Sequence, residues 1–171
     1  MSPRFPVFID LSGQHCVVVG GGEVGTRRVQ SLLNCGARVR VISLGFSEAL
    51  VAWAAAQGED MQALELVERT FRESDLTGAR LVLACTDDAK VNAQIIQCAR
   101  SQQILCNRCD APDESDFYFP GLVTRGELSI GINTNGGSPS VTKQVRELVE
   151  MMLPDDFGER ISQVGRTGGD A

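Results

Sequence analysis

Three glycines near the N-terminus have the spacing of a dinucleotide-binding loop. Gly20, Gly22 and Gly25 follow the apolar residues 16–19 in the order G-x-G-x-x-G, and a helical pattern comes directly after them. In such a loop the first glycine makes the turn, the second lets a pyrophosphate approach the backbone, and the third lets helix and strand pack closely. The phosphates would lie against free N–H groups at the helix N-terminus. The alternative is a glycine-rich turn in another kind of α/β protein.

Two later apolar runs, 81–85 and 104–107, each end in polar residues. The first leads into Thr86 and Asp88, and the second leads into Asp110. Ligands of open α/β sheets bind outside the carboxyl ends of the parallel strands, so we expect these side chains beside the glycine loop. Two structural roles stay open: Asp88 could only cap the next helix, and Asp110 could only be a turn residue.

The elements that must position these residues alternate between strand and helix. Apolar and β-branched runs predict strands at residues 16–19, 38–43, 64–67, 81–85 and 104–107, and helical patterns occupy 26–35, 47–57 and 89–100. This alternation predicts an α/β protein with a Rossmann-type, doubly wound parallel sheet.

The second strand ends about where a dinucleotide fold reads the ribose of its cofactor. Many NAD sites carry Asp or Glu there, whereas this chain has Ser43, followed by Leu44 and Gly45. The missing acid weakens the choice of NAD over NADP. We expect backbone groups at Leu44 and Gly45 to contact the nucleoside instead.

The chain changes in kind after residue 112. Two β-rich runs, 117–124 and 127–134, are separated by Arg125-Gly126, which predicts a β-hairpin. Apolar residues on both sides of an isolated hairpin need cover, and we favour a second subunit. The expected organisation is an NAD-binding domain at 1–112, a hairpin dimerisation region at 113–140 and a helical tail at 141–171, whose residues 165–171 look disordered.

Composition excludes several classes of function. The chain has 171 residues and a net charge of −6, which argues against non-specific binding of nucleic acid. We find no apolar run long enough to span a membrane and no secretory signal, so we expect a soluble cytoplasmic protein. Of the six cysteines, Cys106 and Cys109 form a C-x-x-C. With the single His15 far away in sequence, we expect neither a zinc site nor a redox pair there.

An ordered set of motifs resembles one enzyme family. The set comprises G-G-G-x-V after the first strand, Thr-Asp-Asp after the fourth, Cys-Asn-x-x-Asp-Ala-Pro at the fifth, Phe-Tyr-Phe-Pro with Gly-Glu-Leu-Ser-Ile, and Gly-Gly-Ser-Pro before a helix. From residue 5 to about residue 153 the chain is similar to the precorrin-2 dehydrogenase family, which includes stand-alone enzymes and the N-terminal module of sirohaem synthase. The tail looks short for that family, which implies a truncated chain or help from a partner subunit.

The resemblance implies oxidation of precorrin-2 to sirohydrochlorin with NAD⁺ as hydride acceptor, by a homodimer. By position it assigns NAD contacts to Glu23, Val24, Leu44 and Gly45, with Thr86 close by. It makes Asp110 the catalytic residue for dehydrogenation and, in bifunctional members, for iron insertion.

A tetrapyrrole that carries several carboxylates also needs cations in its site. Arg108, Arg125, Lys143 and Arg146 come from separate elements and are the candidates. Two alternatives stay open: a non-catalytic module that senses NAD(H), and a metal-handling chelatase that acts through Asp110.

Overall fold

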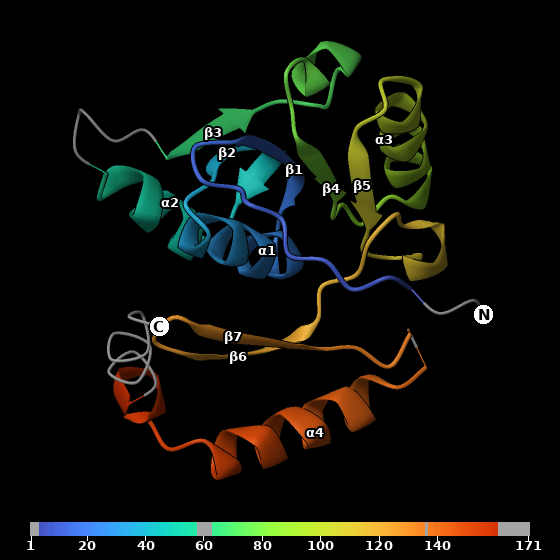
Figure 1. The fold of residues 1–171 in the computed structure, drawn as a ribbon. Coiled ribbons are helices and arrows are strands. Elements are labelled where there is room, and N and C mark those ends of the chain that lie inside the picture. The colour runs from blue at the N-terminus through green and yellow to red at the C-terminus, as the bar shows by residue number, and fades with distance from the viewer. Residues whose placement is uncertain (1–3, 58–62, 136, 161–171) are drawn as a thin grey trace, which may run out of the picture. The chain divides into compact units, whose positions relative to one another are not determined.

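The computed structural model describes residues 4–57, 63–135 and 137–160, which fall into two compact units. The first unit comprises Pro6–Phe117, and the second comprises the chain from Tyr118 onward together with residues 4–5. Figure 1 shows the elements of each unit.

The first unit is built on a parallel sheet of five strands in the order β3-β2-β1-β4-β5. The strands are β1 (His15–Gly21), β2 (Arg38–Phe46), β3 (Leu64–Glu68), β4 (Leu81–Ala84) and β5 (Leu105–Arg108). The order reverses between β1 and β4, and such a switch point is where ligands bind in open α/β sheets. The predicted doubly wound parallel sheet is confirmed.

Helices cover both faces of this sheet. The helices are α1 (Glu23–Asn34), α2 (Glu48–Ala55) and α3 (Ala89–Ser101), and two short 3-10 helices are η1 (Glu73–Leu76) and η2 (Pro112–Glu114). In Figure 1, α1 and α2 lie on one side of the sheet and α3 lies on the other. Helix α1 packs on β1 and β2, whereas α3 packs on β4 and β5.

The two central strands are buried on both faces, which explains why their sequences are almost continuously apolar. Val17 and Val18 of β1 and Val82 and Leu83 of β4 are fully buried. A parallel strand covered by helices on both sides has no solvent face, so it needs no polar alternation. The strand ends at the switch point are therefore held by a rigid core.

The second unit pairs a hairpin with one helix. Strands β6 (Gly121–Arg125) and β7 (Leu128–Ile132) are antiparallel, and α4 (Pro139–Met152) contacts both. The hydroxyl of Ser138 caps α4 by accepting a hydrogen bond from the N–H of Val141 at 3.3 Å. Val123 of β6 is buried, so part of the apolar hairpin surface is covered within the unit.

No helix among the described residues is long and apolar enough to cross a membrane. The predicted disorder of residues 165–171 lies outside the described part of the chain.

Candidate active site

The three motif glycines lie where β1 turns into α1, and each is required for a different steric reason. Gly20 has φ +114, and a Cβ there would collide with the carbonyl oxygen of Cys85 at the end of β4. A Cβ on Gly25 would collide with the carbonyl oxygen of Gly20, so this glycine lets α1 press against β1. Both residues hold the loop tightly against the sheet.

Gly22 differs because the space beside it is open. It is the N-cap of α1, it has an ordinary φ of −76, and a Cβ there would meet no atom within 4 Å. Gly22 has no side chain with which to cap the first N–H groups of α1, so those donors face this opening. Glu23 and Val24 are exposed on the same turn. The residues present therefore fit the pyrophosphate of a dinucleotide, which favours such a helix N-terminus.

The end of β2 is tied to this loop. The hydroxyl of Ser43 accepts a hydrogen bond from the N–H of Gly21 at 3.0 Å, and the N–H of Ser47 donates to the carbonyl of Gly21 at 2.9 Å. The register between the strands shifts there, which leaves Leu44 73% exposed and Gly45 with open space at its Cα. Leu44 and Gly45 thus lie next to the glycine loop, where we expect residues that contact the nucleoside. Ser43 holds the loop in place through its hydrogen bond with Gly21.

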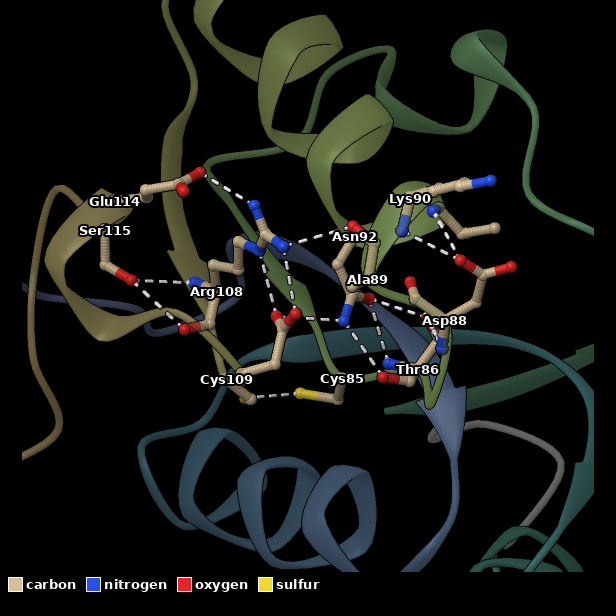
Figure 2. Close-up of polar contacts among 12 residues, drawn as sticks. Cys85, Thr86, Asp88, Ala89, Lys90, Asn92, Arg108, Cys109, Glu114 and Ser115 are labelled. Atoms are coloured by element: carbon tan, nitrogen blue, oxygen red, sulfur yellow. Dashed lines mark hydrogen bonds and ion pairs between the residues drawn. The ribbon is translucent and has the colours of Figure 1, made fainter.

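The end of β4 is organised by a buried amide. Asn92 of α3 is fully buried, and its Oδ1 accepts hydrogen bonds from the backbone N–H of Thr86 at 3.1 Å and from the Thr86 hydroxyl at 2.7 Å. Asp88 is the N-cap of α3, because its carboxylate accepts from the N–H groups of Lys90 and Val91. Figure 2 shows this arrangement. The capping role considered for Asp88 is confirmed.

The same amide reaches the end of β5. The Nδ2 of Asn92 donates to Asp110 Oδ1 at 3.0 Å, and Arg108 donates to both carboxylate oxygens of Asp110, from Nε and from Nη2, each at 3.0 Å. Arg108 also pairs with Glu114 at 2.7 Å and donates to the carbonyl of Ala89 at 3.1 Å. Asp110 is therefore fixed in one orientation by β5 and α3.

These contacts set the charge of Asp110. Its hydrogen bonds from Arg108 lower the pKa of the Asp110 carboxyl below its usual value of 3.8, although partial burial opposes the shift. Asp110 in turn raises the pKa of Arg108. Because the carboxylate is ionised at neutral pH and its side chain is about one-third exposed, it can accept a proton or a hydrogen bond from a ligand.

Asn92 was missed by the sequence reasoning, but a signal for it exists. It occurs at helical spacing with Ile95, Ile96 and Ala99, which form the buried face of α3. A lone amide on an apolar helix face must find hydrogen-bond partners inside the protein, because burying it unpaired costs free energy.

The four predicted substrate cations are divided between the units. Arg108 is buried and committed to Asp110 and Glu114 in the first unit. In the second unit Arg125 donates to the carbonyl of Leu153, Lys143 pairs with Glu147, and Arg146 pairs with Glu150. Their contact with a substrate stays a prediction. Among the described residues, no group of three or more His, Cys, Asp or Glu side chains could hold a metal ion.

A Rossmann sheet with this glycine loop and an open helix N-terminus defines an NAD-binding protein, and the comparisons with known proteins agree. A family described as "Putative NAD(P)-binding" matches residues 7–121. A siroheme synthase of Citrobacter koseri is 38% identical over 95% of this chain and 35% of its own length. A siroheme synthase of Escherichia coli O1:K1 is 36% identical over 97% of this chain and 35% of its own length.

Among solved structures, "SirC, precorrin-2 dehydrogenase" matches with a TM-score of 0.77 and 26% identity, over 93% of this chain and 76% of that one. The chain belongs to this NAD(P)-binding family, and its resemblance to the precorrin-2 dehydrogenases is confirmed. It spans about a third of the length of the curated relatives that it matches.

Proposed function

We propose that this chain catalyses the NAD-dependent dehydrogenation of precorrin-2 to sirohydrochlorin. The observation that carries the proposal is the ionised Asp110 carboxylate, fixed by Arg108 and Asn92 at the same sheet edge as the open glycine loop. The names of the relatives support it, because they are siroheme synthases and a precorrin-2 dehydrogenase.

The roles follow from the chemistry of the reaction. When bound, NAD⁺ supplies the hydride acceptor. Residues Gly20, Gly22, Glu23, Val24 and Gly25 would hold the pyrophosphate, and Ser43, Leu44, Gly45 and Thr86 would surround the rest of the cofactor. Asp110 would take the proton that leaves the substrate as the hydride departs. Arg125, Lys143 and Arg146 would meet substrate carboxylates.

The test is an assay of the purified chain with precorrin-2 and NAD⁺. The proposal predicts that NADH and the spectrum of sirohydrochlorin appear together. An NAD(H)-sensing module would bind the nucleotide without turnover, which would overturn the proposal. Incubating sirohydrochlorin with Fe²⁺ or Co²⁺ tests separately for the chelatase alternative.

We also propose that the active form is a homodimer formed through residues 113–140 and located in the cytoplasm. Leu122 of β6 lies within this region and is 51% exposed, and exposed apolar residues continue beyond it along α4 at Val141, Val145, Leu148 and Met152. An apolar surface of this kind suits a protein interface. All six cysteines are free thiols, which suits a reducing compartment.

A further inference from the structure

Two thiols face each other at the carboxyl ends of the neighbouring strands β4 and β5. Ala84 and Arg108 are register partners, and the N–H of Cys109 donates to the carbonyl of Ala84 at 3.0 Å. Cys85 and Cys109 come one residue later on each strand, and their Sγ atoms are 2.9 Å apart. Figure 2 shows both side chains pointing toward each other.

This position suits a disulfide bond. Neighbouring strands lie about 4.8 Å apart, and disulfide-bonded cysteines have Cα atoms separated by about 4.4 to 6.8 Å. A covalent bond therefore needs the two sulfur atoms to approach from 2.9 Å to about 2.05 Å.

The two thiols differ in access and acidity. Cys85 is 9% exposed, whereas Cys109 is half-buried. The hydrogen bond from Cys85 and the Arg28 guanidinium together lower the pKa of the Cys109 thiol to about 7, against the opposing effects of burial and of Asp110. The hydrogen bond to Cys109 and burial raise the pKa of Cys85. Cys109 is thus the nucleophilic thiol, and Cys85 is the thiol that can resolve a mixed disulfide.

We propose that Cys85 and Cys109 form a reversible redox site that reacts with low-molecular-weight disulfides of the glutathione class. The Cys109 thiolate attacks one sulfur of the small disulfide and displaces a small thiolate. Cys85 then loses its proton to solvent, attacks the Cys109 sulfur of the mixed disulfide and displaces the second small thiolate. Two protein thiols become one disulfide, and one small disulfide becomes two thiols.

The C-x-x-C of Cys106 and Cys109 is not this pair. Cys106 is fully buried within β5, and its Sγ donates to the Asp116 carboxylate at 3.0 Å. Residues three apart along extended chain point to opposite sides, which separates the Cys106 sulfur from that of Cys109. From the sequence we expect no redox function for Cys106 and Cys109 as a pair. That expectation does not concern the different pair of Cys85 and Cys109.

The test is to equilibrate the folded chain with oxidised and reduced glutathione, block the remaining thiols by alkylation and map the tryptic peptides. Cleavage after Arg80, Lys90, Arg100, Arg108 and Arg125 places Cys85 in peptide 81–90, Cys106 in 101–108 and Cys109 in 109–125. The proposal predicts a linked pair of peptides 81–90 and 109–125 that dithiothreitol separates. A link between 101–108 and 109–125, or no link at ratios that oxidise Cys109, would overturn it.

Single variants separate the two roles. Cys85→Ser should accumulate a glutathione adduct on Cys109, and Cys109→Ser should leave Cys85 unmodified. Cys35→Ser, which removes an exposed thiol elsewhere, should form the link as the wild type does. Equal glutathione adducts on Cys85 and Cys109 would contradict the assigned order. The readout is mass alone, so it is independent of the proposed dehydrogenase activity.

Discussion

Asp110 combines a fixed orientation with a lowered pKa. The lowered pKa has two opposite consequences for a general base. Arg108 keeps the carboxylate ionised, which makes it available to accept a proton at any pH near neutrality. A lower pKa also makes it a weaker base. If Asp110 is the proposed general base, its contribution to the rate would come from orientation, because a group that is already oriented avoids the cost of ordering it during the reaction.

The first prediction concerns the carboxylate itself. Asp110→Asn keeps the shape and one acceptor oxygen but removes the basic group. We expect turnover to fall by about 100-fold or more, the range of a positioned general base, while the affinity for NAD⁺, measured by calorimetry, stays near that of the wild type. Asp113→Asn is the matched control, an exposed carboxylate of η2 that should leave turnover unchanged. A fully active Asp110→Asn enzyme with a lower melting temperature would mean that Asp110 is only a turn residue.

The second prediction concerns Arg108 as a positioning residue. Removing its guanidinium lets the pKa of Asp110 rise toward 3.8. If Asp110 must be ionised for turnover, the acidic limb of the pH profile of kcat/KM should move to higher pH in Arg108→Gln. Arg108→Lys keeps the charge and should restore part of the original profile. Lower activity with an unmoved acidic limb would show that Arg108 matters for stability alone.

At the level of elements, the glycine loop joins β1, β2, β4 and α1, and its glycines are not equivalent. Gly20 and Gly25 are needed for folding, because a Cβ on either would strike backbone atoms. The fold does not require glycine at position 22, because a Cβ there points into open space and its φ is one that any residue adopts.

The third prediction follows from this difference. Gly22→Val should abolish measurable NAD⁺ binding by calorimetry and leave the melting temperature close to that of the wild type, since only the space for the pyrophosphate is filled. Gly25→Val should lower the melting temperature strongly, because the side chain would force α1 away from β1. Normal NAD⁺ affinity in Gly22→Val would mean that the loop does not hold the pyrophosphate.

The 3-10 helix η1 supplies a test of stability against pH. Asp75 is 3% exposed. Its carboxylate accepts hydrogen bonds from both terminal nitrogens of Arg69 and from the backbone N–H of Arg72. The hydrogen bonds from Arg69 lower the pKa of Asp75. A lowered folded-state pKa means that Asp75 stabilises the fold above its ordinary value of 3.8, and that this contribution is lost as the pH falls below 3.8.

The fourth prediction is therefore that Asp75→Asn lowers the free energy of unfolding at neutral pH by about 1 to 3 kcal/mol. The difference from the wild type should shrink as the pH drops below 3.8, which denaturant titrations at several pH values will measure. Glu73→Gln, an exposed change in the same turn, is the control. A difference that does not vary with pH would mean that packing, and not the ion pair, explains the loss.

The elements that repeat a simple pattern could be predicted from the sequence. The five strands and their helices could be predicted because each apolar run is bounded by glycine or polar residues. A continuous apolar run such as Leu81–Ala84 is typical of a parallel strand that helices cover on both faces. For Gly22 the motif spacing predicts a ligand position, and the structure shows open space beside this residue.

Features that depend on contacts between elements could not be predicted in this way. The Ser43 hydroxyl accepts a hydrogen bond from the N–H of Gly21, which lies 22 residues away in the sequence. No local sequence pattern predicts that hydrogen bond. The pairing of Arg108 with Asp110, and of Cys85 with Cys109, depends on strand order and register, which place distant residues side by side only after the sheet has formed.

For the whole molecule, the chain covers about a third of the siroheme synthases that it matches but three-quarters of the precorrin-2 dehydrogenase structure. The part it shares with both contains the NAD-binding unit and the hairpin unit. The proposed activity therefore rests on two units, one with the glycine loop and one with the exposed apolar residues of the proposed dimer interface.

The last prediction concerns that partner. In sedimentation at micromolar concentration the wild-type chain should be a dimer, since Leu122 of β6 is 51% exposed within the predicted interface and Leu148 of α4 is 55% exposed. Leu122→Glu introduces a charge that becomes costly only if the site is buried by a second copy, so it should give a monomer with an unchanged melting temperature at high dilution. Val51→Glu, at an equally exposed apolar position of α2, should remain a dimer. A fully active wild-type monomer would contradict the homodimer, and dimers in both variants would place the interface elsewhere.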